Sequence, residues 1–225
     1  MWCVPEINRE FVDRMEGLLR LFAKPENRLE PVVCLDERPV QLLDSKRAGS
    51  RARPGKLATF DYEYKRRGTA NIFCVVEPRA GRRQTRATPN RTGKAFARTL
   101  KRIAKRYRAA RTIHLVLDNL STHSEKCVRD HFGDLAGKRL WKRFTVHYTP
   151  KHASWLNPAE MEVSLVSREC LGNRRLGTFK LLSREVAAWN RRADRARRRI
   201  DWKWRVSDAR RVFRYDGINT SRSKD

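Results

Sequence analysis

Three acidic side chains stand where carboxylates can act together on a metal ion. Asp36 follows an apolar run that is expected to form a strand, and Asp118 ends a second such run, HLVLDN. Glu160 lies just inside a helix that Asn157 and Pro158 are expected to open. Carboxylates at the carboxyl ends of strands project from a sheet edge, where α/β proteins bind their ligands. Their oxygens bind hard cations, and two such ions about 3.5–4 Å apart promote phosphodiester cleavage. The three acids therefore predict a metal site for phosphodiester chemistry.

Each acid also has an ordinary structural interpretation. Asp36 could be a turn residue after its strand, and Asp118 with Asn119 could form an Asx turn. The stretch 157–160, Asn-Pro-Ala-Glu, matches a capping box with Pro at the first helical position, so Glu160 could serve the helix alone. The order of the three acids, the elements that carry them and the basic charge of the chain together favour the metal site.

Hydrophobic periodicity predicts the elements that must position these acids. Strands are expected at 31–43, at 112–119, at 143–150, and within 59–78 as two strands around a turn at Arg67-Gly68. Residues 79–90 are expected to form another hairpin and a short strand. Helices are expected over 6–23, 91–109, 123–132, 158–170 and 178–190. Antiparallel strands come first and a βαβα order follows, which predicts an α/β fold with a mixed sheet flanked by helices.

The charge of the chain restricts the classes of protein to which it can belong. Of its 225 residues, 52 are Lys or Arg and 25 are Asp or Glu, which gives a formal net charge of +27. This charge favours a polyanionic partner, above all DNA, and disfavours an ordinary metabolic enzyme. Because 40% of the residues are hydrophobic, with six Trp and nine Phe, the chain can still bury a core, and its charge does not indicate disorder.

No segment indicates export or a membrane span. No run approaches the ~20 apolar residues that a membrane helix needs, and the first residues, MWCVPEINRE, lack the pattern of a signal peptide. The five cysteines are widely spaced and form no CxxC, which argues against a disulfide framework or a thiolate zinc site. We therefore expect reduced thiols and a cytoplasmic location.

Basic segments predict where DNA would be held. They occur in the loop 45–56, after the second hairpin strand at 79–86, along the helix 91–109 and at 191–214, where eleven Lys or Arg stand against three Asp. A solvated helix face would mix the two signs of charge, whereas these segments hardly do. Contacts to phosphates give affinity without sequence choice, so we expect binding to weaken steeply with salt.

Several side chains near the acids are candidates for DNA contact. Lys151, His152 and Trp155 lie on the loop before Glu160, where a cation and an aromatic ring suit gripping of a strand. Packing of Trp155 in the core is the alternative. The remaining candidates are Asn119 and His123, which could instead cap a helix or lie in the core, and the successive basic residues Lys65, Arg66 and Arg67.

The segments VVCLDE, DNLSTH and TPKHASWLNPAE together resemble the DDE transposases of bacterial insertion sequences related to mariner elements, the six-thirty group. In that family the first Asp follows a hydrophobic strand, the second begins a D-N-x-x-x-H stretch, and the third acid lies in a pattern like S-x-x-L-N-P-x-E. The matching residues are Asp36, Asp118 and Glu160. The resemblance covers about residues 30–215, nearly the whole chain.

The resemblance implies a ribonuclease-H-like fold with a mixed five-stranded sheet. It also implies two Mg²⁺ or Mn²⁺ ions held by Asp36, Asp118 and Glu160. The implied reaction is hydrolysis at a transposon end, followed by attack of the freed 3′-hydroxyl on target DNA, with no covalent protein–DNA intermediate. Glu162 lies about 200° around the helix from Glu160, so only one can face the site, and the resemblance selects Glu160. Glu37 is expected to face the other side of its strand and to pair with Arg38 or Lys151.

The chain departs from the family pattern in two ways. The 41 residues between Asp118 and Glu160 are more than is usual in mariner relatives, and the extra length lies in 133–144, where a loop and short helix are expected. Residues 1–30 resemble only a linker helix, so we expect a catalytic domain over 31–216 and a flexible tail over 217–225. A separately encoded helix-turn-helix half is then a candidate partner. A homodimer formed through the helix 6–23 is another, unless that helix packs on its own domain.

Two other functions are compatible with parts of the sequence. The chain could be a non-catalytic, basic DNA-binding remnant of a truncated transposase, whose acids only cap turns. It could also be another ribonuclease-H-like nuclease, such as a Holliday-junction resolvase or an RNA-hybrid nuclease. The segment SWLNPAE favours the transposase.

Overall fold

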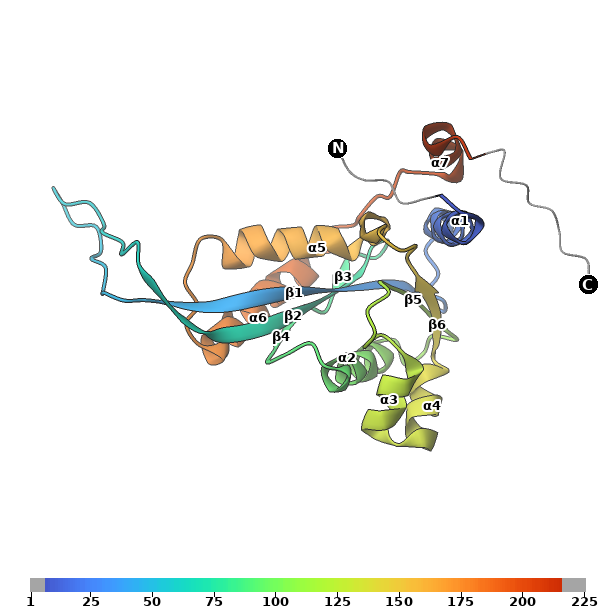
Figure 1. Cartoon of the computed structure of the whole chain (residues 1–225), viewed down its shortest axis with the longest axis horizontal. Helices are drawn as coiled ribbons and strands as arrows, with labels where there is room; N and C mark the ends of the chain where they lie inside the picture. The colour runs from blue at the N-terminus through green and yellow to red at the C-terminus, as the bar shows by residue number, and fades with distance from the viewer. Residues whose placement is uncertain (1–6, 216–225) are drawn as a thin grey trace, which may run out of the picture.

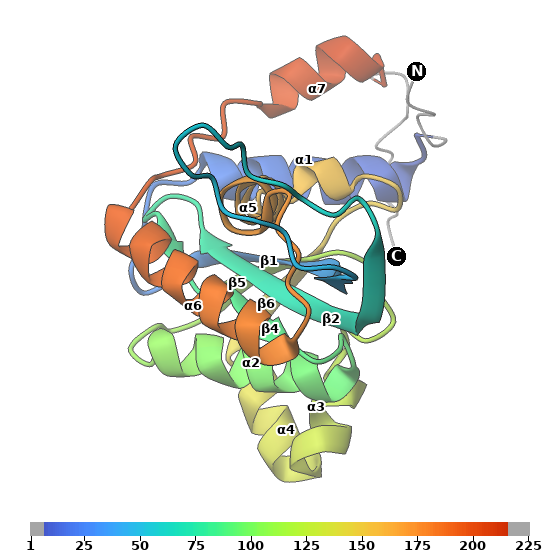
Figure 2. The same cartoon turned by 90° about the vertical axis from the view of Figure 1, so that its left-hand side faces the viewer.

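Apolar runs of the sequence form one mixed sheet with helices on both faces (Figures 1 and 2). The structure, a computed structural model, describes residues 7–215. The strands are β1 (Val32–Ser45), β2 (Tyr64–Glu77), β3 (Arg82–Arg83), β4 (Arg86–Thr88), β5 (Ile113–Leu117) and β6 (Phe144–Tyr148). The helices are α1 (Arg9–Ala23), α2 (Gly93–Arg106), α3 (Glu125–Phe132), α4 (Asp134–Trp141), α5 (Ala159–Leu165), α6 (Phe179–Ala196) and α7 (Val206–Phe213). A 3-10 turn (Ser154–Leu156) precedes α5, and a π-helical segment (Val166–Leu171) extends it.

The strand order confirms the predicted mixed α/β fold. The order is β3-β2-β1-β5-β6, and β4 also pairs with β2. β1 runs antiparallel to β2 and parallel to β5, which in turn runs parallel to β6. The sheet has six strands rather than the five that the resemblance implies. Residues 79–90, where a hairpin and a short strand were expected, form two short strands that both pair with β2. The expected helix in 133–144 is present as α4.

Residues 64–77 form one long strand, so the turn predicted at Arg67-Gly68 is wrong. The pairing with β1 shifts between Leu42 and Leu43, opposite these residues, and Gly68 has a φ of +116°. A bulge with Gly in this region of φ bends a strand without ending it. The connection between β1 and β2 is instead the segment 46–63, which projects far from the body as an arm (Figure 1).

Alternate residues of β1 point to opposite faces of the sheet. Cys34 packs with α1 residues such as Met15, whereas Leu35 packs with α2 residues such as Phe96. A third cluster joins the outer half of β1 and β2 to α6 through residues such as Trp189. Figure 1 shows α1, α5 and α7 above the sheet and α2, α3 and α4 below it. The period of two along β1 therefore decides which of its acids face α5 and which face α2.

Helix α1 packs on its own domain, which was the alternative to a dimer interface. Its apolar side contributes Met15, Leu18 and Leu19 to the cluster around Cys34. Helix α7 lies on α1 (Figures 1 and 2), and the buried Glu16 accepts hydrogen bonds from Arg210 Nε at 3.0 Å and from the Tyr215 hydroxyl at 2.9 Å. The expected tail, 217–225, lies outside the described residues.

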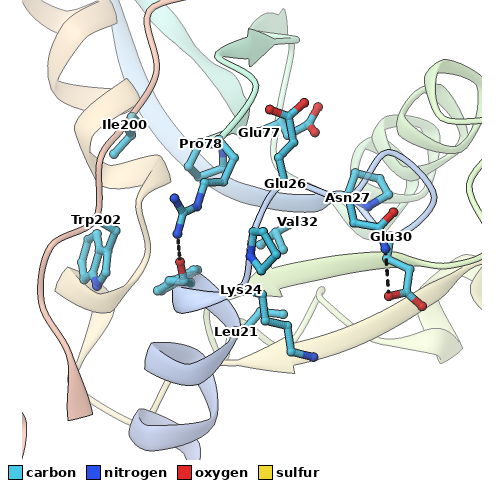
Figure 3. Close-up of a pocket in the computed structure, with 14 residues that line it drawn as sticks. Leu21, Lys24, Glu26, Asn27, Glu30, Val32, Glu77, Pro78, Ile200 and Trp202 are labelled. Atoms are coloured by element: carbon cyan, nitrogen blue, oxygen red, sulfur yellow. Dashed lines mark hydrogen bonds between the residues drawn. The ribbon is translucent and has the colours of Figure 1, made fainter. Parts of the chain in front are cut away.

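A small pocket lies where α1 ends and β1 begins, away from the three acids (Figure 3). Arg79 and Trp202 line it, and Arg79 donates a hydrogen bond to the carbonyl of Phe22 at 2.6 Å. Its volume is about 20 Å³, and a water needs at least about 10–15 Å³. The pocket therefore has room for about one water and none for a nucleotide. Among residues 7–215, no helix has the length and apolar character needed to cross a membrane.

Candidate active site

Asp36 and Asp118 lie side by side on neighbouring parallel strands. The last pair in the register between β1 and β5 is Cys34 with Val116, and each acid follows two residues later on the same face. Asp36 was expected to end its strand, but it lies within β1. The strand continues to Ser45 and pairs only with β2 from this point, because β5 ends at Leu117. The sheet therefore opens beside Asp36, and both carboxylates project at this opening.

Asn157 fixes the start of α5 against β1, next to Asp36. Its side-chain amide donates to the carbonyl of Leu35 at 2.8 Å, and its side-chain oxygen accepts from the backbone N–H of Ala159 at 3.1 Å. The backbone N–H of Asn157 donates to the carbonyl of Ser154 at 2.7 Å instead of to Glu160. The reciprocal half of a capping box is therefore missing, and the carboxylate of Glu160 is not used to cap its own helix.

The neighbouring acids act on Asp36. Burial, together with the charges of Glu160, Glu37 and Asp118, raises the pKa of Asp36 to about 7 against the hydrogen bond from the Glu37 backbone N–H. In the part of the chain that the structure describes, no Lys or Arg forms an ion pair with Asp36 or Glu160. Hard oxygen donors with uncompensated negative charge are what Mg²⁺ and Mn²⁺ bind. The donor set thus fits the metal ions that the resemblance implies.

His123 connects Asp118 to Glu37 across the sheet. Its Nδ1 lies 2.6 Å from Asp118 Oδ1 and its Nε2 lies 2.7 Å from Glu37 Oε1. Burial by itself would lower the pKa of His123, but the two carboxylates overcome this effect and raise it to about 9. Burial also acts to raise the pKa of Asp118, yet pairing with His123 keeps it below its ordinary value. His123 is therefore a cation that orients two acids and stacks on Phe96, with ring centroids 4.6 Å apart.

This arrangement changes two predictions from the sequence. Only 1% of His123 is exposed, so its predicted contact with DNA does not fit its position, and the core alternative does. Glu37 faces away from Asp36 as expected, but its partner is His123 rather than Arg38 or Lys151. The alternation along β1 predicts the face on which Glu37 lies, and the D-N-x-x-x-H spacing draws attention to His123. Neither pattern shows that His123, just before α3, lies beside Glu37.

Glu37, Asp118 and His123 offer ligand atoms that all lie within 4.8 Å of one another. However, both ring nitrogens of His123 already contact carboxylates, and a protonated imidazole has no lone pair for a metal. We therefore interpret this trio as support for Asp118 rather than as the metal site.

Glu162 has a structural role that the sequence left open. It is fully buried and accepts a hydrogen bond from Arg83 Nε at 2.9 Å, and Arg83 is itself buried. Arg83 also donates to the carbonyls of Gly81 and Arg198 at 2.8 and 2.9 Å. Glu162 thus anchors α5 to the strand edge, and Glu160 lies on a different side of the helix.

The remaining candidates for DNA contact occupy three places. Asn119 is exposed but bonded, because it donates to the carbonyl of Thr149 at 2.7 Å and accepts from Arg14 at 2.9 Å. On the loop before α5, Lys151 and His152 are exposed, and Trp155 is 42% exposed with its ring centroid 5.0 Å from that of Trp204. The third place is the outer part of β2, where Lys65, Arg66 and Arg67 lie at the base of the arm and Arg67 pairs with Asp44 at 3.0 Å.

Comparison with known proteins identifies one family. The sequence profile described as "DDE superfamily endonuclease" matches residues 31–183. No curated protein sequence matches the chain. The structure of the Mos1 mariner paired end complex with Mn is similar, with a TM-score of 0.50 and 16% identity over 86% of this chain and 63% of that chain. The Mos1 strand transfer complex is similar with a TM-score of 0.54 and 17% identity over 85% of this chain and 57% of that chain.

These similarities bear on the fold. At 16–17% identity they show a shared architecture, and they confirm the predicted ribonuclease-H-like class. The chain spans less than two thirds of the length of either Mos1 chain. The profile match includes all three predicted site acids, since it begins before Asp36 and ends after Glu160.

Proposed function

The chain belongs to the DDE superfamily endonucleases, and we propose that it is the catalytic domain of a DNA transposase. The reaction would be hydrolysis of a phosphodiester at an insertion-sequence end, followed by transfer of the freed 3′-hydroxyl end to target DNA. One observation carries the proposal, namely that Asp118 and Glu160 lie close enough to Asp36 for their charges to raise its pKa. The net charge of +27 supports DNA as the substrate.

Asp36, Asp118 and Glu160 are the residues that would hold two Mg²⁺ or Mn²⁺ ions. Bound in this way, such ions supply activation of the attacking oxygen and stabilisation of the leaving oxygen. The chain's own contribution is preorganisation. Asn157 holds the first turn of α5 against β1, and His123 holds Asp118 in its ionised form. The start of α5 and the ionised carboxylate of Asp118 are therefore in place before DNA arrives.

The loop before α5 is proposed to grip the DNA strand beside the acids. Lys151 and His152 offer exposed cations or donors, and Trp155 offers an aromatic face. Lys65 and Arg66, at the base of the arm, are proposed as further contacts to phosphates. These contacts are expected to supply affinity rather than sequence choice.

We further propose that the chain belongs to the six-thirty group and works with partners. The motifs DNLSTH and SWLNPAE support this group. We assign recognition of the transposon ends to a separately encoded helix-turn-helix protein. We assign the joining of two ends to a homodimer of this chain. The catalytic domain would extend over 31–216, with 1–30 as a linker region whose helix α1 packs on it.

Binding of Mn²⁺ measured by calorimetry tests the metal site. Wild-type protein should bind Mn²⁺, in the presence or absence of DNA, and Asp118→Asn should lose this binding. Asp44→Asn, which removes an exposed carboxylate from the same strand β1, is the matched control and should bind as the wild type does. Equal binding by all three proteins, or no binding even with DNA, would contradict the proposal and favour the non-catalytic remnant.

Cleavage assays then identify the substrate class. Linear DNA that carries insertion-sequence ends should be cut in a reaction that requires the divalent ion and Asp118. Four-way junctions and RNA–DNA hybrids, offered under the same conditions, should be cut more slowly. A preference for either of these would favour the other ribonuclease-H-like nucleases instead.

A further inference from the structure

A basic groove runs along β4, at the edge of the sheet beyond β2. Its walls come from α2 and α6, which cover opposite faces of the sheet at this edge (Figure 2). The groove consists of two hollows of about 390 and 380 Å³ that share Arg86, Ala87, Arg102 and Ser183. Because the hollows share these residues, they form one elongated depression, which we call the β4 groove.

Four arginines of the β4 groove lack acidic partners. Arg86, Arg98, Arg102 and Arg191 are exposed, and within residues 7–215 none of them forms an ion pair. Burial lowers the pKa of Arg102, and the charges of Arg86 and Arg98 lower it further, so these cations lie close enough to repel one another. Positive charge concentrated in this way is unfavourable unless an anion binds there.

The neighbouring turn of α2 shows how the chain neutralises arginines elsewhere. Arg106, one turn after Arg102, forms an ion pair with Asp194 of α6 at 2.9 Å. Asp194 also accepts from the backbone N–H of Arg83 at 2.8 Å. The interface between α2 and α6 is therefore neutralised at one end and left positive along the groove.

The floor of the groove carries further polar groups. Asn190 accepts a hydrogen bond from the backbone N–H of Thr85 at 2.6 Å, and its amide nitrogen has no partner among residues 7–215. Thr85 is 4% exposed, lines the groove, and has a hydroxyl without a partner in the described chain. Because Thr85 is buried, the amide of Asn190 is the polar group of the floor that remains available to a ligand.

The β4 groove is separate from the three acids. Arg86 pairs with Phe73 in the sheet, and Phe73 pairs with Glu37. Two strand spacings, or about 10 Å of backbone, therefore separate the groove from β1. The side chain of Phe73 packs in the cluster with α2, whereas Asp36 lies on the face covered by α5. A phosphate in the groove therefore lies off the edge of the sheet, about two strand spacings from the strand that carries Asp36.

We propose that the β4 groove binds the phosphodiester backbone of a DNA segment outside the cleavage site, without sequence preference. The elongated shape fits a polymer rather than a single anion, and guanidinium, amide and hydroxyl donors match phosphate oxygens. The choice of DNA as the polyanion rests on the proposed function. The groove would hold flanking or target DNA while the acids act on the end.

The test compares two triple variants of the full chain that lose equal charge. The groove variant is Arg98→Gln/Arg102→Gln/Arg191→Gln, and the control is Arg28→Gln/Arg139→Gln/Lys142→Gln, at exposed positions without ion pairs in the described structure. Affinity for a duplex of random sequence is measured by fluorescence anisotropy in EDTA over a range of KCl concentrations. Circular dichroism and thermal unfolding verify that both variants are folded.

The groove variant should bind DNA more weakly, and its plot of log K against log salt should be shallower than the wild-type plot by up to about 2.7, which is about 0.9 for each phosphate that the variant no longer neutralises. The control should change the slope by less than half as much. Equal changes in the two variants would overturn the proposal, because the effect would then be one of net charge. A larger loss for duplex RNA than for duplex DNA would overturn the assignment to DNA.

The same assay separates this proposal from the proposed function. If the wild type cuts no DNA but the groove variant still shows the shallower slope, the groove stands and the transposase assignment fails. If cleavage is normal and the slopes are equal, the groove fails alone.

Discussion

Neutralising Asp36 should stabilise the metal-free protein at neutral pH while it removes metal binding. The carboxylate is buried, and the charges of Glu160, Glu37 and Asp118 lie around it. Asp36→Asn removes one of the repelling charges and keeps the side-chain oxygen that accepts from the Glu37 backbone N–H at 2.7 Å. The substitution therefore changes the charge of the site while it leaves the size of the side chain and the packing around it nearly unchanged.

The size of the effect follows from the pKa of Asp36, which is raised from 3.8 to about 7 in the folded protein. This difference corresponds to about 4 kcal/mol of unfavourable free energy when the carboxylate is fully ionised. Because the folded-state pKa is raised, the penalty is absent below about pH 4, grows between about pH 4 and 7, and is complete above that range. We expect Asp36→Asn to be more stable than the wild type by about 2–4 kcal/mol at about pH 8, and to differ little at about pH 4.

Urea unfolding in EDTA at these two pH values measures the effect. The control Asp44→Asn removes a carboxylate that forms an exposed pair with Arg67 at 3.0 Å, so it should change stability by less than about 1 kcal/mol at either pH. Addition of Mn²⁺ should raise the stability of the wild type and leave Asp36→Asn unchanged. A loss of stability in Asp36→Asn at the higher pH would refute the reasoning, because burial and the neighbouring acids would then not disfavour the ionised carboxylate.

Three further predictions concern contacts around the site. The pKa of Glu16 lies below its ordinary value because hydrogen bonds from Arg210 and Tyr215 outweigh burial, so the docking of α7 should weaken as the pH falls below about 4.5. Tryptophan fluorescence should report this change, and Glu16→Gln should abolish its pH dependence. His123→Asn should slow DNA cleavage roughly 10–100-fold because Asp118 loses its orienting partner, and an unchanged single-turnover rate would exclude that role. Arg83→Met should lower the free energy of unfolding by about 3–5 kcal/mol because it leaves Glu162 buried and unpaired, whereas Arg83→Met/Glu162→Leu should recover most of the loss; a double variant as unstable as the single one would contradict this account.

The elements that carry the acids could be predicted from the sequence because their patterns are local. Continuous apolar runs produced β1, β5 and β6 close to their expected positions. The helical period placed α1, α2 and the beginning of α6, although α6 continues to Ala196. Asp36 and Asp118 stood out because each is adjacent to such a run, and Glu160 because it lies just inside the helix that Asn157 and Pro158 were expected to open. Their roles as metal ligands remain a prediction that the calorimetry tests.

The errors in the prediction share a cause. Gly68 usually marks a turn, and only pairing with β1 shows that it forms a bulge within β2. A hairpin was expected within residues 79–90, but β3 and β4 both pair with β2 instead of with each other. The segment contains too few apolar positions to reveal this pairing. In each case the partner strand lies far along the sequence, and its hydrogen bonds override the local preference.

Composition and local patterning by themselves determined that this chain is basic, mixed α/β, and equipped with acids near strand ends. Only the tertiary structure decided which side each charged group faces and which group it meets. It joined Glu37 to His123 across 86 positions of sequence, buried Glu162 against Arg83, and left the arginines of the β4 groove without acids. Such pairings depend on strand register and helix packing between distant segments, whereas periodicity records only which residues avoid water.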